Sequence, residues 1–449
     1  MRIAVIGAGI SGLVAAHRLH PRHDITVYEA NDYPGGHTNT VRVDLADETH
    51  WVDTGFIVLN DRNYPNFEPL LAELGVATQP SHMSFSVSDG EGGFEYAGTP
   101  RGLFAKPSHA LNPSFLRMLA DLARFNREAR ALLELSPGDG PSLRDFLAEG
   151  GYGEWFVQRL IVPQAAAVWS AEPEQMWSFP AGFLARFFHN HGMLGLRDRP
   201  QWRTVIGGSR RYVEEIIRPF ADRLRLSAPV RAVTRHDDSV EVEADGCETE
   251  RYDEVVIAAH SDQALGMLTD PSHGEREVLG ATAFQANQAV LHTDERLLPH
   301  RRAAWASWNF HLHPGKDSAG RPDPSSPSPV PRTTLTYWMN NLQSLESKTN
   351  FCVSLNMAEK IDPSKVIRTI DYSHPVFTPE GVAGQGRHAE ISGVNRTHYC
   401  GAYWRWGFHE DGVVSALHAL DRVGNTRERV PTARAPAPSL RGRAANEVL

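Results

Sequence analysis

Six residues near the N-terminus have the types and the spacing needed to hold a dinucleotide. They read Gly7-Ala8-Gly9-Ile10-Ser11-Gly12 and follow an apolar run that predicts a short buried strand over residues 2–6. Gly7 permits a tight turn, Gly9 lets the backbone approach a pyrophosphate, and Gly12 allows the next helix to pack closely on the strand. The helix predicted over residues 10–19 would point its free N–H groups and partial positive charge at the phosphates.

An acidic residue follows at a suitable distance. Glu29 ends a second predicted strand over residues 24–29 and lies 17 residues after Gly12. A carboxylate in this position can accept hydrogen bonds from both ribose hydroxyl groups. The glycines alone could form a turn without a ligand. The strand, turn, helix, strand and acid together predict a dinucleotide site.

A second pair of glycines bears on the choice between a flavin and a nicotinamide. Gly35 and Gly36 are followed by His37. This segment resembles the extended fingerprint of the flavin amine oxidase superfamily, in which two glycines precede an arginine and, three positions later, a serine or threonine. Here His37 replaces the arginine, and Thr40 takes the last position. His37 can donate to a phosphate, but a histidine carries only part of a charge at neutral pH.

Further segments resemble the same superfamily in the right order, namely its Gly-Gly turn, its adenine-side strand, the strand closing that layer and its last flavin-contacting segment. They are residues 205–210, 229–233, 252–259, 401–403 and 407–416. By this resemblance the backbone of Val230 would contact the adenine side, and an acid at Glu410 or Asp411 would face ribityl or pyrophosphate oxygens. The helix N-terminus near Val413 would point at the flavin.

The resemblance implies FAD as the cofactor. The expected contacts are Gly7, Gly9, Ile10, Ser11, Gly12, Glu29, Ala30, Gly35, Gly36, His37, Thr38, Val230, Gly401, Glu410, Asp411 and Val413. No second glycine fingerprint follows a predicted strand, so a separate NAD(P)H domain is not expected. Electrons would then leave to oxygen, a quinone or a partner protein.

The elements that must position these residues predict an α/β fold. We expect a Rossmann-like FAD-binding domain of the glutathione reductase type, interleaved with an α+β substrate domain that carries a helical cap. The FAD-binding parts are expected at residues 1–70, 201–265 and 391–423, the helical substrate region at 71–200, the substrate-domain strands at 266–390 with a mobile loop at 314–332, and a disordered, basic tail at 424–449. Within 266–390, strands are predicted near residues 288–293, 303–312 and 333–355.

The helical region is rich in aromatic residues. Helical spacing is evident over residues 114–135, and a further helix begins at Ser142. The aromatic set comprises Trp169, Trp177, Phe179, Phe183, Phe187 and Phe188. These side chains form either an ordinary helical core or, in part, the wall of an apolar substrate pocket.

The superfamily removes hydride from a carbon beside nitrogen or, as in its phytoene desaturase branch, desaturates a carbon chain. Amine oxidases commonly place a lysine near the flavin, and Lys360 is the best candidate among few lysines. A finer resemblance, to a bacterial subgroup of NAD/FAD-binding oxidoreductases linked to fatty acyl modification, rests on residues 51–60, 187–192, 201–203 and 407–412. We therefore expect dehydrogenation or desaturation of an apolar, fatty acyl chain, including a methyl-branched one. An amine oxidase and a non-catalytic flavoprotein remain the alternatives.

Three histidines are candidate proton acceptors for such a reaction. They are His189, His191 and His409, each of which could equally be a packing or cofactor-orienting residue. Asp53 and Asn60 would lie near the flavin ring by analogy with the superfamily. Tyr403 and Trp404 would either face the flavin or belong to the core.

Composition limits the remaining possibilities. The formal net charge of −9 argues against nucleic acid as a partner. Three scattered cysteines argue against a disulfide framework and a metal site and fit a reducing cytoplasm. No apolar run is long enough to span a membrane. The expected partner is a small or lipid-like substrate, with peripheral membrane contact and oligomeric state left open.

Overall fold

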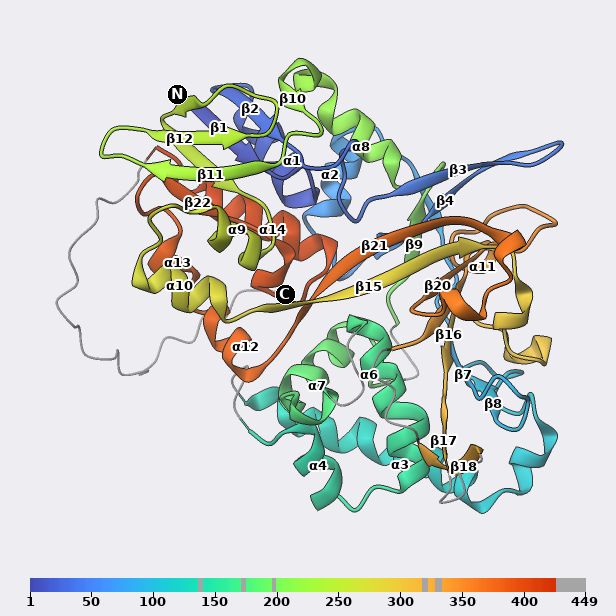
Figure 1. The fold of residues 1–449 in the computed structure, drawn as a ribbon. Coiled ribbons are helices and arrows are strands. Elements are labelled where there is room, and N and C mark those ends of the chain that lie inside the picture. Colours follow the sequence, from blue (N-terminus) through green and yellow to red (C-terminus); the bar gives the residue numbers. More distant parts are fainter. Residues whose placement is uncertain (136–139, 171–174, 196–198, 317–321, 328–332, 425–449) are drawn as a thin grey trace.

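The computed structural model describes residues 1–135, 140–170, 175–195, 199–316, 322–327 and 333–424 (Figure 1). Its first layer is a five-stranded parallel sheet in the order β10-β2-β1-β14-β22. The strands are β1 (Arg2–Ile6), β2 (Asp24–Tyr28), β10 (Leu224–Arg225), β14 (Glu254–Ile257) and β22 (Thr397–Tyr399). The central strands β1 and β14 are almost wholly apolar because both faces of a parallel sheet are covered. Three distant parts of the chain therefore build one sheet.

Helices cover one face of this sheet, and a small sheet with two further helices covers the other. The first face carries α1 (Ile10–Leu19), α2 (Phe67–Glu73), α8 (Arg210–Ile217) and α14 (His409–Leu420), joined in one apolar core. The other face carries α9 (Ser261–Met267), α10 (His273–Gly280) and the antiparallel strands β11 (Val230–Arg235), β12 (Val240–Ala244) and β13 (Glu250–Tyr252). This arrangement confirms the predicted α/β class.

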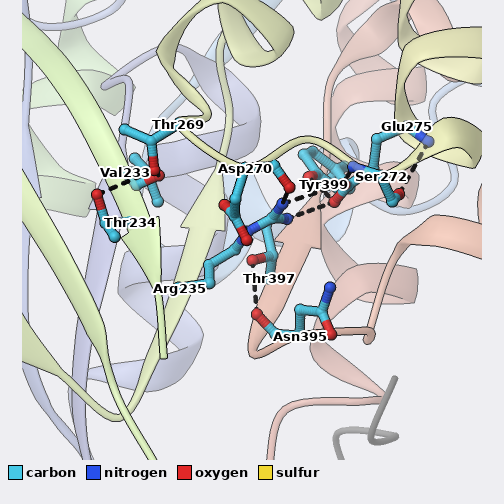
Figure 2. A network of polar contacts seen from close by, with 10 residues as sticks. All are labelled: Val233, Thr234, Arg235, Thr269, Asp270, Ser272, Glu275, Asn395, Thr397 and Tyr399. Carbon is cyan, nitrogen blue, oxygen red and sulfur yellow. Dashed lines mark hydrogen bonds and ion pairs between the residues drawn. The ribbon is translucent and has the colours of Figure 1, made fainter. Parts of the chain in front are cut away.

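A buried ionic cluster joins β11, α10 and β22 within this part of the molecule (Figure 2). Arg235 donates from Nη2 to Glu275 Oε2 at 3.1 Å and from Nε to Asp270 Oδ1 at 2.9 Å. Tyr399 donates its hydroxyl to Glu275 Oε1 at 2.6 Å. Burial raises the pKa of the Glu275 carboxyl, but the hydrogen bond and charge of Arg235 outweigh it, so the pKa lies below its ordinary value.

The second layer is a seven-stranded sheet in the order β21-β15-β20-β19-β16-β7-β8. Its strands are β7 (Phe85–Ser88), β8 (Glu95–Ala97), β15 (Ala283–His292), β16 (Trp308–His311), β19 (Leu335–Trp338), β20 (Cys352–Leu355) and β21 (Val366–Val376). The long strands β15 and β21 run between the two halves of the molecule (Figure 1). The sequence indicated β16, β19, β20 and the end of β15. It did not indicate β21, whose edge position leaves most of its N-terminal half exposed and removes the apolar alternation.

A helical layer packs on this sheet and shares one apolar core with β7, β16 and β19. It comprises α3 (Pro113–Glu128), α4 (Leu143–Glu149), α5 (Glu154–Phe156), α6 (Val162–Trp169) and α7 (Ala181–Asn190). The helix predicted over residues 114–135 continues beyond α3 as the 3₁₀ turn η2 (Ala129–Glu134). Ser142 caps α4, since its Oγ accepts from Asp145 N at 3.1 Å.

The remaining elements are short. They are the hairpin β3 (Thr40–Asp44) and β4 (Thr49–Asp53), the three-stranded sheet of β5 (Val58–Asn60), β9 (Trp202–Val205) and β6 (Thr78–Pro80), and the helices α11 (Met339–Leu342), α12 (Pro379–Gln385) and α13 (His388–Ile391). The loop expected at residues 314–332 contains an antiparallel pair, β17 (Pro314–Lys316) and β18 (Pro322–Pro327). Its other residues lie outside the described part of the chain, as does the expected tail from 425 onward. No described helix has the length and apolar character needed to cross a membrane.

Candidate cofactor and active site

A single cavity of about 2190 Å³ extends from the glycine turn after β1 to the helical layer and the seven-stranded sheet. Its volume exceeds the roughly 300–1,000 Å³ of an ordinary small-molecule pocket. All three layers contribute to its walls. The cavity can therefore hold a dinucleotide and, beyond it, a second molecule.

The three fingerprint glycines have different surroundings. Gly7 has a φ of +100°, and an added Cβ would lie 2.6 Å from Ala258 O. Gly9 lines the cavity, and an added Cβ would meet no atom within 4 Å. At Gly12 an added Cβ would lie 1.8 Å from Gly7 O, so this glycine allows α1 to pack on the strand and does not line the cavity. Only Gly9 keeps open a space that a ligand would fill.

Glu29 lines the cavity at the end of β2. Its Oε2 accepts from Ala8 N at 2.7 Å, and its Oε1 accepts from Asn31 N at 2.9 Å and Asn31 Nδ2 at 2.8 Å. These bonds fix the carboxylate beside the glycine turn. Because a carboxylate has about four acceptor sites, it retains capacity for a ribose hydroxyl.

The second glycine pair brings His37 to the cavity. Gly35 N donates to Ala8 O at 2.8 Å, and an added Cβ at Gly36 would lie 3.2 Å from Gly9 Cα. The His37 ring stacks on Tyr372 with 4.7 Å between centroids. Burial, and then the nearby His374, hold the pKa of His37 well below its usual value, so the ring is neutral.

His37 Nε2 is buried and has no hydrogen-bond partner among the described residues. A buried polar atom without a partner beside a cavity is expected to bond to a ligand. The open space at Gly9, the fixed acid at Glu29 and this ring nitrogen all border the same cavity. The residues present therefore fit a bound dinucleotide.

The other expected cofactor residues divide into two groups. Ile10, Ser11, Ala30, Val230 and Gly401 line the cavity together with those above. Gly12, Thr38, Glu410, Asp411 and Val413 do not. Thr38 and Val413 are buried behind the wall, where Val413 belongs to the core around α1 and α14.

The two acids of α14 have partners within the protein. Glu410 accepts from Asn66 N at 3.1 Å and Phe67 N at 2.9 Å, and it therefore caps the N-terminus of α2. Asp411 accepts from Phe408 N at 2.9 Å, and burial raises its pKa to about 7. We expected one of these acids to face the cofactor, but both bond within the protein and neither lines the cavity. Gly407, Phe408 and His409 line the cavity instead. The N-terminus of α14 therefore borders the cavity at His409, four residues before the expected Val413.

His409 is held by its neighbours. Its ring stacks on Phe56 with 3.6 Å between centroids and an interplanar angle of 9°. Its Nε2 is 2.7 Å from Tyr212 Oη and 2.9 Å from Thr38 Oγ1. Burial lowers the pKa of His409 to about 3. A neutral ring with an engaged Nε2 orients other groups and is a poor proton acceptor.

His191 lines the cavity beside Phe187, with 3.9 Å between ring centroids. Its Nδ1 donates to Phe187 O at 2.9 Å. Because a carbonyl can only accept, Nδ1 carries the proton and Nε2 carries the lone pair. Burial lowers the pKa of His191 to about 4, so the lone pair is free at neutral pH. His189 is exposed and does not line the cavity.

The residues implied by analogy lie elsewhere. Asp53 is buried behind the wall and accepts from Ser209 N at 2.9 Å and Ser209 Oγ at 2.8 Å, which anchors the turn before α8. Burial raises its pKa to about 6. Asn60 Oδ1 accepts from Asn63 N at 2.8 Å. Neither residue borders the cavity.

Aromatic residues contribute both core and wall. Trp169, Phe187 and Tyr403 line the cavity, whereas Phe179, Phe183, Phe188 and Trp404 are buried in the surrounding core. Arg144 lies over the ring of Trp177 at 5.4 Å. The aromatic set therefore contributes both to the core and to the wall of the cavity.

Several cavity residues were not anticipated. Tyr372 and His374 lie on β21, the strand that the sequence did not indicate. His374 Nδ1 accepts from Asn287 Nδ2 at 2.9 Å, and burial lowers its pKa to about 4. No lysine with a described side chain lines the cavity, and Lys360 lies on a surface turn. Tyr372 and His374 could have been found from the sequence only if β21 had been recognised as a strand.

Comparison with known proteins agrees with this geometry. Residues 10–347 match the family described as flavin containing amine oxidoreductase. The cyclohexylamine oxidase from Brevibacterium oxydans IH-35A has a TM-score of 0.66 at 16% identity, covering 94% of this chain and 98% of that one. The CLA-producing fatty acid isomerase from P. acnes has a TM-score of 0.62 at 15% identity, with 94% and 98% covered. At these identities the structures establish a shared fold.

The family match spans most of the chain, and the cavity has the features that a dinucleotide requires. FAD, when bound, supplies a group that can accept hydride from a substrate carbon. The protein supplies the cradle at Gly9, the acid at Glu29 and the walls of the substrate space. This chain belongs to the flavin containing amine oxidoreductase family and is an FAD-dependent oxidoreductase.

Proposed function

We propose that the enzyme dehydrogenates an apolar, fatty acyl chain. The observation that carries this proposal is the part of the cavity between the helical layer and the seven-stranded sheet. Its wall includes Leu119, Leu122, Leu160, Val168, Trp169, Phe187, Phe85, Trp308 and Tyr337. Apolar surface of this extent favours a ligand that gains free energy by leaving water.

The charges around the cavity favour an acyl chain over an amine. A cationic amine requires a carboxylate or another electronegative partner when it leaves water. Glu29 and Asp371 are the only carboxylates among the described lining residues, and Glu29 lies at the dinucleotide turn. Asp371 lies on β21 and is exposed. The helical part of the cavity thus has no described acid to neutralise an amine.

The amine alternative retains one supporting feature. Trp305, Trp308, Tyr337 and Trp338 line another part of the cavity, and aromatic faces attract cations. The family also includes amine oxidases by its description. The fatty acid isomerase with the same fold indicates that this scaffold also accepts acyl chains. The substrate assay below distinguishes these cases.

We propose that His191 accepts the proton that leaves the substrate. Dehydrogenation of a carbon chain removes a hydride from one carbon and a proton from its neighbour. Nε2 of His191 is the lone-pair nitrogen of a neutral ring on the cavity wall, and its orientation is fixed by the Nδ1 bond to Phe187. His409 would position Tyr212 and Thr38 behind the wall without exchanging a proton.

The test is anaerobic mixing of the FAD-loaded protein with two panels of compounds. One panel holds saturated, unsaturated and methyl-branched acyl lipids, and the other holds primary and secondary amines. We expect the oxidised flavin band to bleach with an acyl lipid and not with amines. Bleaching by amines alone, with peroxide release in air, would favour the amine oxidase. Silence in both panels would favour a non-catalytic flavoprotein.

A further inference from the structure

Residues 104–116, which lead into α3 and form its first turn, carry three exposed apolar side chains. Phe104 is 40% exposed, Leu111 is 87% exposed and Leu116 is 46% exposed. The other large apolar residues exposed in the described chain are Met1, Ile206, Leu226, Val366 and Ile367. Thus, of the eight exposed large apolar residues in the described chain, three lie within the thirteen residues 104–116. Singly scattered exposed apolar residues are normal, whereas several on one short segment make that segment a candidate contact surface.

The segment is well ordered by its own contacts. The 3₁₀ turn η1 (Pro107–Leu111) is followed by α3, whose N-cap Asn112 accepts from Ser114 N at 2.9 Å. Phe115 is fully buried, and the centroid of its ring lies 6.0 Å from that of the Phe104 ring. The exposed side chains are therefore presented on a fixed base and do not belong to a loose loop.

The charge of this segment differs in sign from that of the chain. Residues 98–120 contain Arg101, Lys106 and Arg117 and no aspartate or glutamate, in a protein with a formal net charge of −9. Lys106 Nζ donates to the carbonyl of Gly93 and forms no ion pair with a carboxylate among the described residues. Arg117 has a 65% exposed side chain and lies 3.8 Å from Asp121.

The same segment walls the cavity. Pro100 and Leu103 line the cavity, as do Leu119 and Leu122, which lie about one and two turns beyond Leu116 on α3. This part of the chain thus carries exposed apolar and basic side chains as well as residues that border the apolar part of the cavity. A molecule held at this surface would therefore lie beside the substrate space.

We propose that residues 98–120 form a docking surface for an anionic lipid bilayer. The apolar side chains Phe104, Leu111 and Leu116 would enter the boundary between headgroups and acyl chains, and the three basic residues would contact anionic headgroups. This combination of apolar and basic groups matches the chemistry of such a boundary. The proposal goes beyond the proposed function and does not depend on the identity of the oxidised substrate.

The test is co-sedimentation of the FAD-loaded full-length protein with vesicles, without turnover. One set contains phosphatidylcholine alone, and the other contains phosphatidylcholine with phosphatidylglycerol. We expect stronger binding to the second set, weakening as salt is added. The double variant Leu111→Asp with Leu116→Asp should reduce partitioning at least tenfold. The matched control, Val366→Asp with Ile367→Asp, alters two similarly exposed residues on β21 and should bind as the wild type does.

A second variant separates charge from apolar contact. Arg101→Ser, Lys106→Ser and Arg117→Ser together should weaken binding to anionic vesicles by roughly 100-fold, at about fivefold for each basic residue near the surface. Flavin absorbance and thermal unfolding identify any variant that fails to fold. If the double aspartate variant does not fold, the triple serine variant alone tests the proposal. Wild-type binding equal in both vesicle sets, or unaffected by either variant, would overturn the proposal. Light scattering that shows a dimer disrupted by the aspartates would instead assign the surface to a second copy of this chain.

Discussion

Replacing Gly9 by valine separates cofactor binding from folding. Gly9 has φ −73° and ψ 179°, which any residue can adopt, and its added Cβ would meet no atom within 4 Å. The apoprotein should therefore fold, with its free energy of unfolding changed by about 1 kcal/mol or less for a substitution at this N-cap. The valine side chain would occupy the space in which a pyrophosphate approaches α1.

The expected loss of affinity follows from the contacts removed. Displacing the pyrophosphate from the N-terminus of α1 costs at least two charge-assisted hydrogen bonds, each contributing about 1.5–3 kcal/mol. The sum of about 3–6 kcal/mol corresponds to FAD binding weaker by roughly 10²- to 10⁴-fold. The measurement is calorimetric titration of apoprotein with FAD, together with thermal unfolding of the apoprotein.

Gly12→Ala serves as the contrasting variant. Its Cβ would lie 1.8 Å from Gly7 O, so the apoprotein itself should lose stability. If Gly9→Val bound FAD with wild-type affinity, the pyrophosphate would not lie at this turn and the assignment of the site would be wrong. If Gly9→Val destabilised the apoprotein as much as Gly12→Ala, the inference that the protein leaves room for a side chain at Gly9 would be wrong.

Further predictions concern proton transfer, the buried cluster and His37. His191→Asn should lower the rate of flavin reduction by about 10²- to 10⁴-fold with FAD still bound, whereas the exposed His189→Asn should not. Since burial sets the pKa of His191 to about 4, activity should be lost through this group only as the pH falls through about 4. Glu275→Gln should destabilise the protein by about 3 kcal/mol in denaturant titrations, because Arg235 stays buried and charged, while the exposed Glu277→Gln should cost at most about 1 kcal/mol. The pKa of Glu275 is depressed in the folded state, so the carboxylate stabilises the protein fully above about pH 4.5. This stabilisation is lost as the pH falls through the pKa of the folded state, where the free energies of unfolding of the wild type and Glu275→Gln should converge. His37→Phe should weaken FAD binding by about 10- to 100-fold if Nε2 bonds to the cofactor, and unchanged affinity would contradict that role.

The dinucleotide end of the site was predictable because its signals are local. Each fingerprint glycine answers a requirement of backbone geometry at its own position, and the acid follows at the end of the adjacent strand. The resemblance also located the C-terminal segment that borders the cavity. The orientation of its side chains was not predictable, because Glu410 caps α2 through Asn66 and Phe67, more than 340 residues away in sequence.

The substrate end was harder to predict because tertiary contacts define it. β21 lies at a sheet edge and mixes polar and apolar residues, so its sequence shows no strand periodicity, and Tyr372 and His374 stayed hidden with it. The sequence alone does not distinguish the roles of the three candidate histidines. Burial and hydrogen bonding separate them. His191 has an oriented lone pair on the cavity wall, whereas His409 also lines the cavity but has its Nε2 engaged by Tyr212 and Thr38. His189 is exposed.

We propose above all that this FAD-dependent oxidoreductase acts on an acyl chain in the apolar part of its cavity. The most direct measurement is mass spectrometry of the products of an anaerobic single turnover, with stoichiometric enzyme and an acyl lipid that bleaches the flavin. We predict a product lighter than the substrate by two hydrogen atoms, formed in an amount equal to the FAD reduced. An unchanged acyl lipid, together with conversion of an amine to its imine or aldehyde under the same conditions, would contradict the claim.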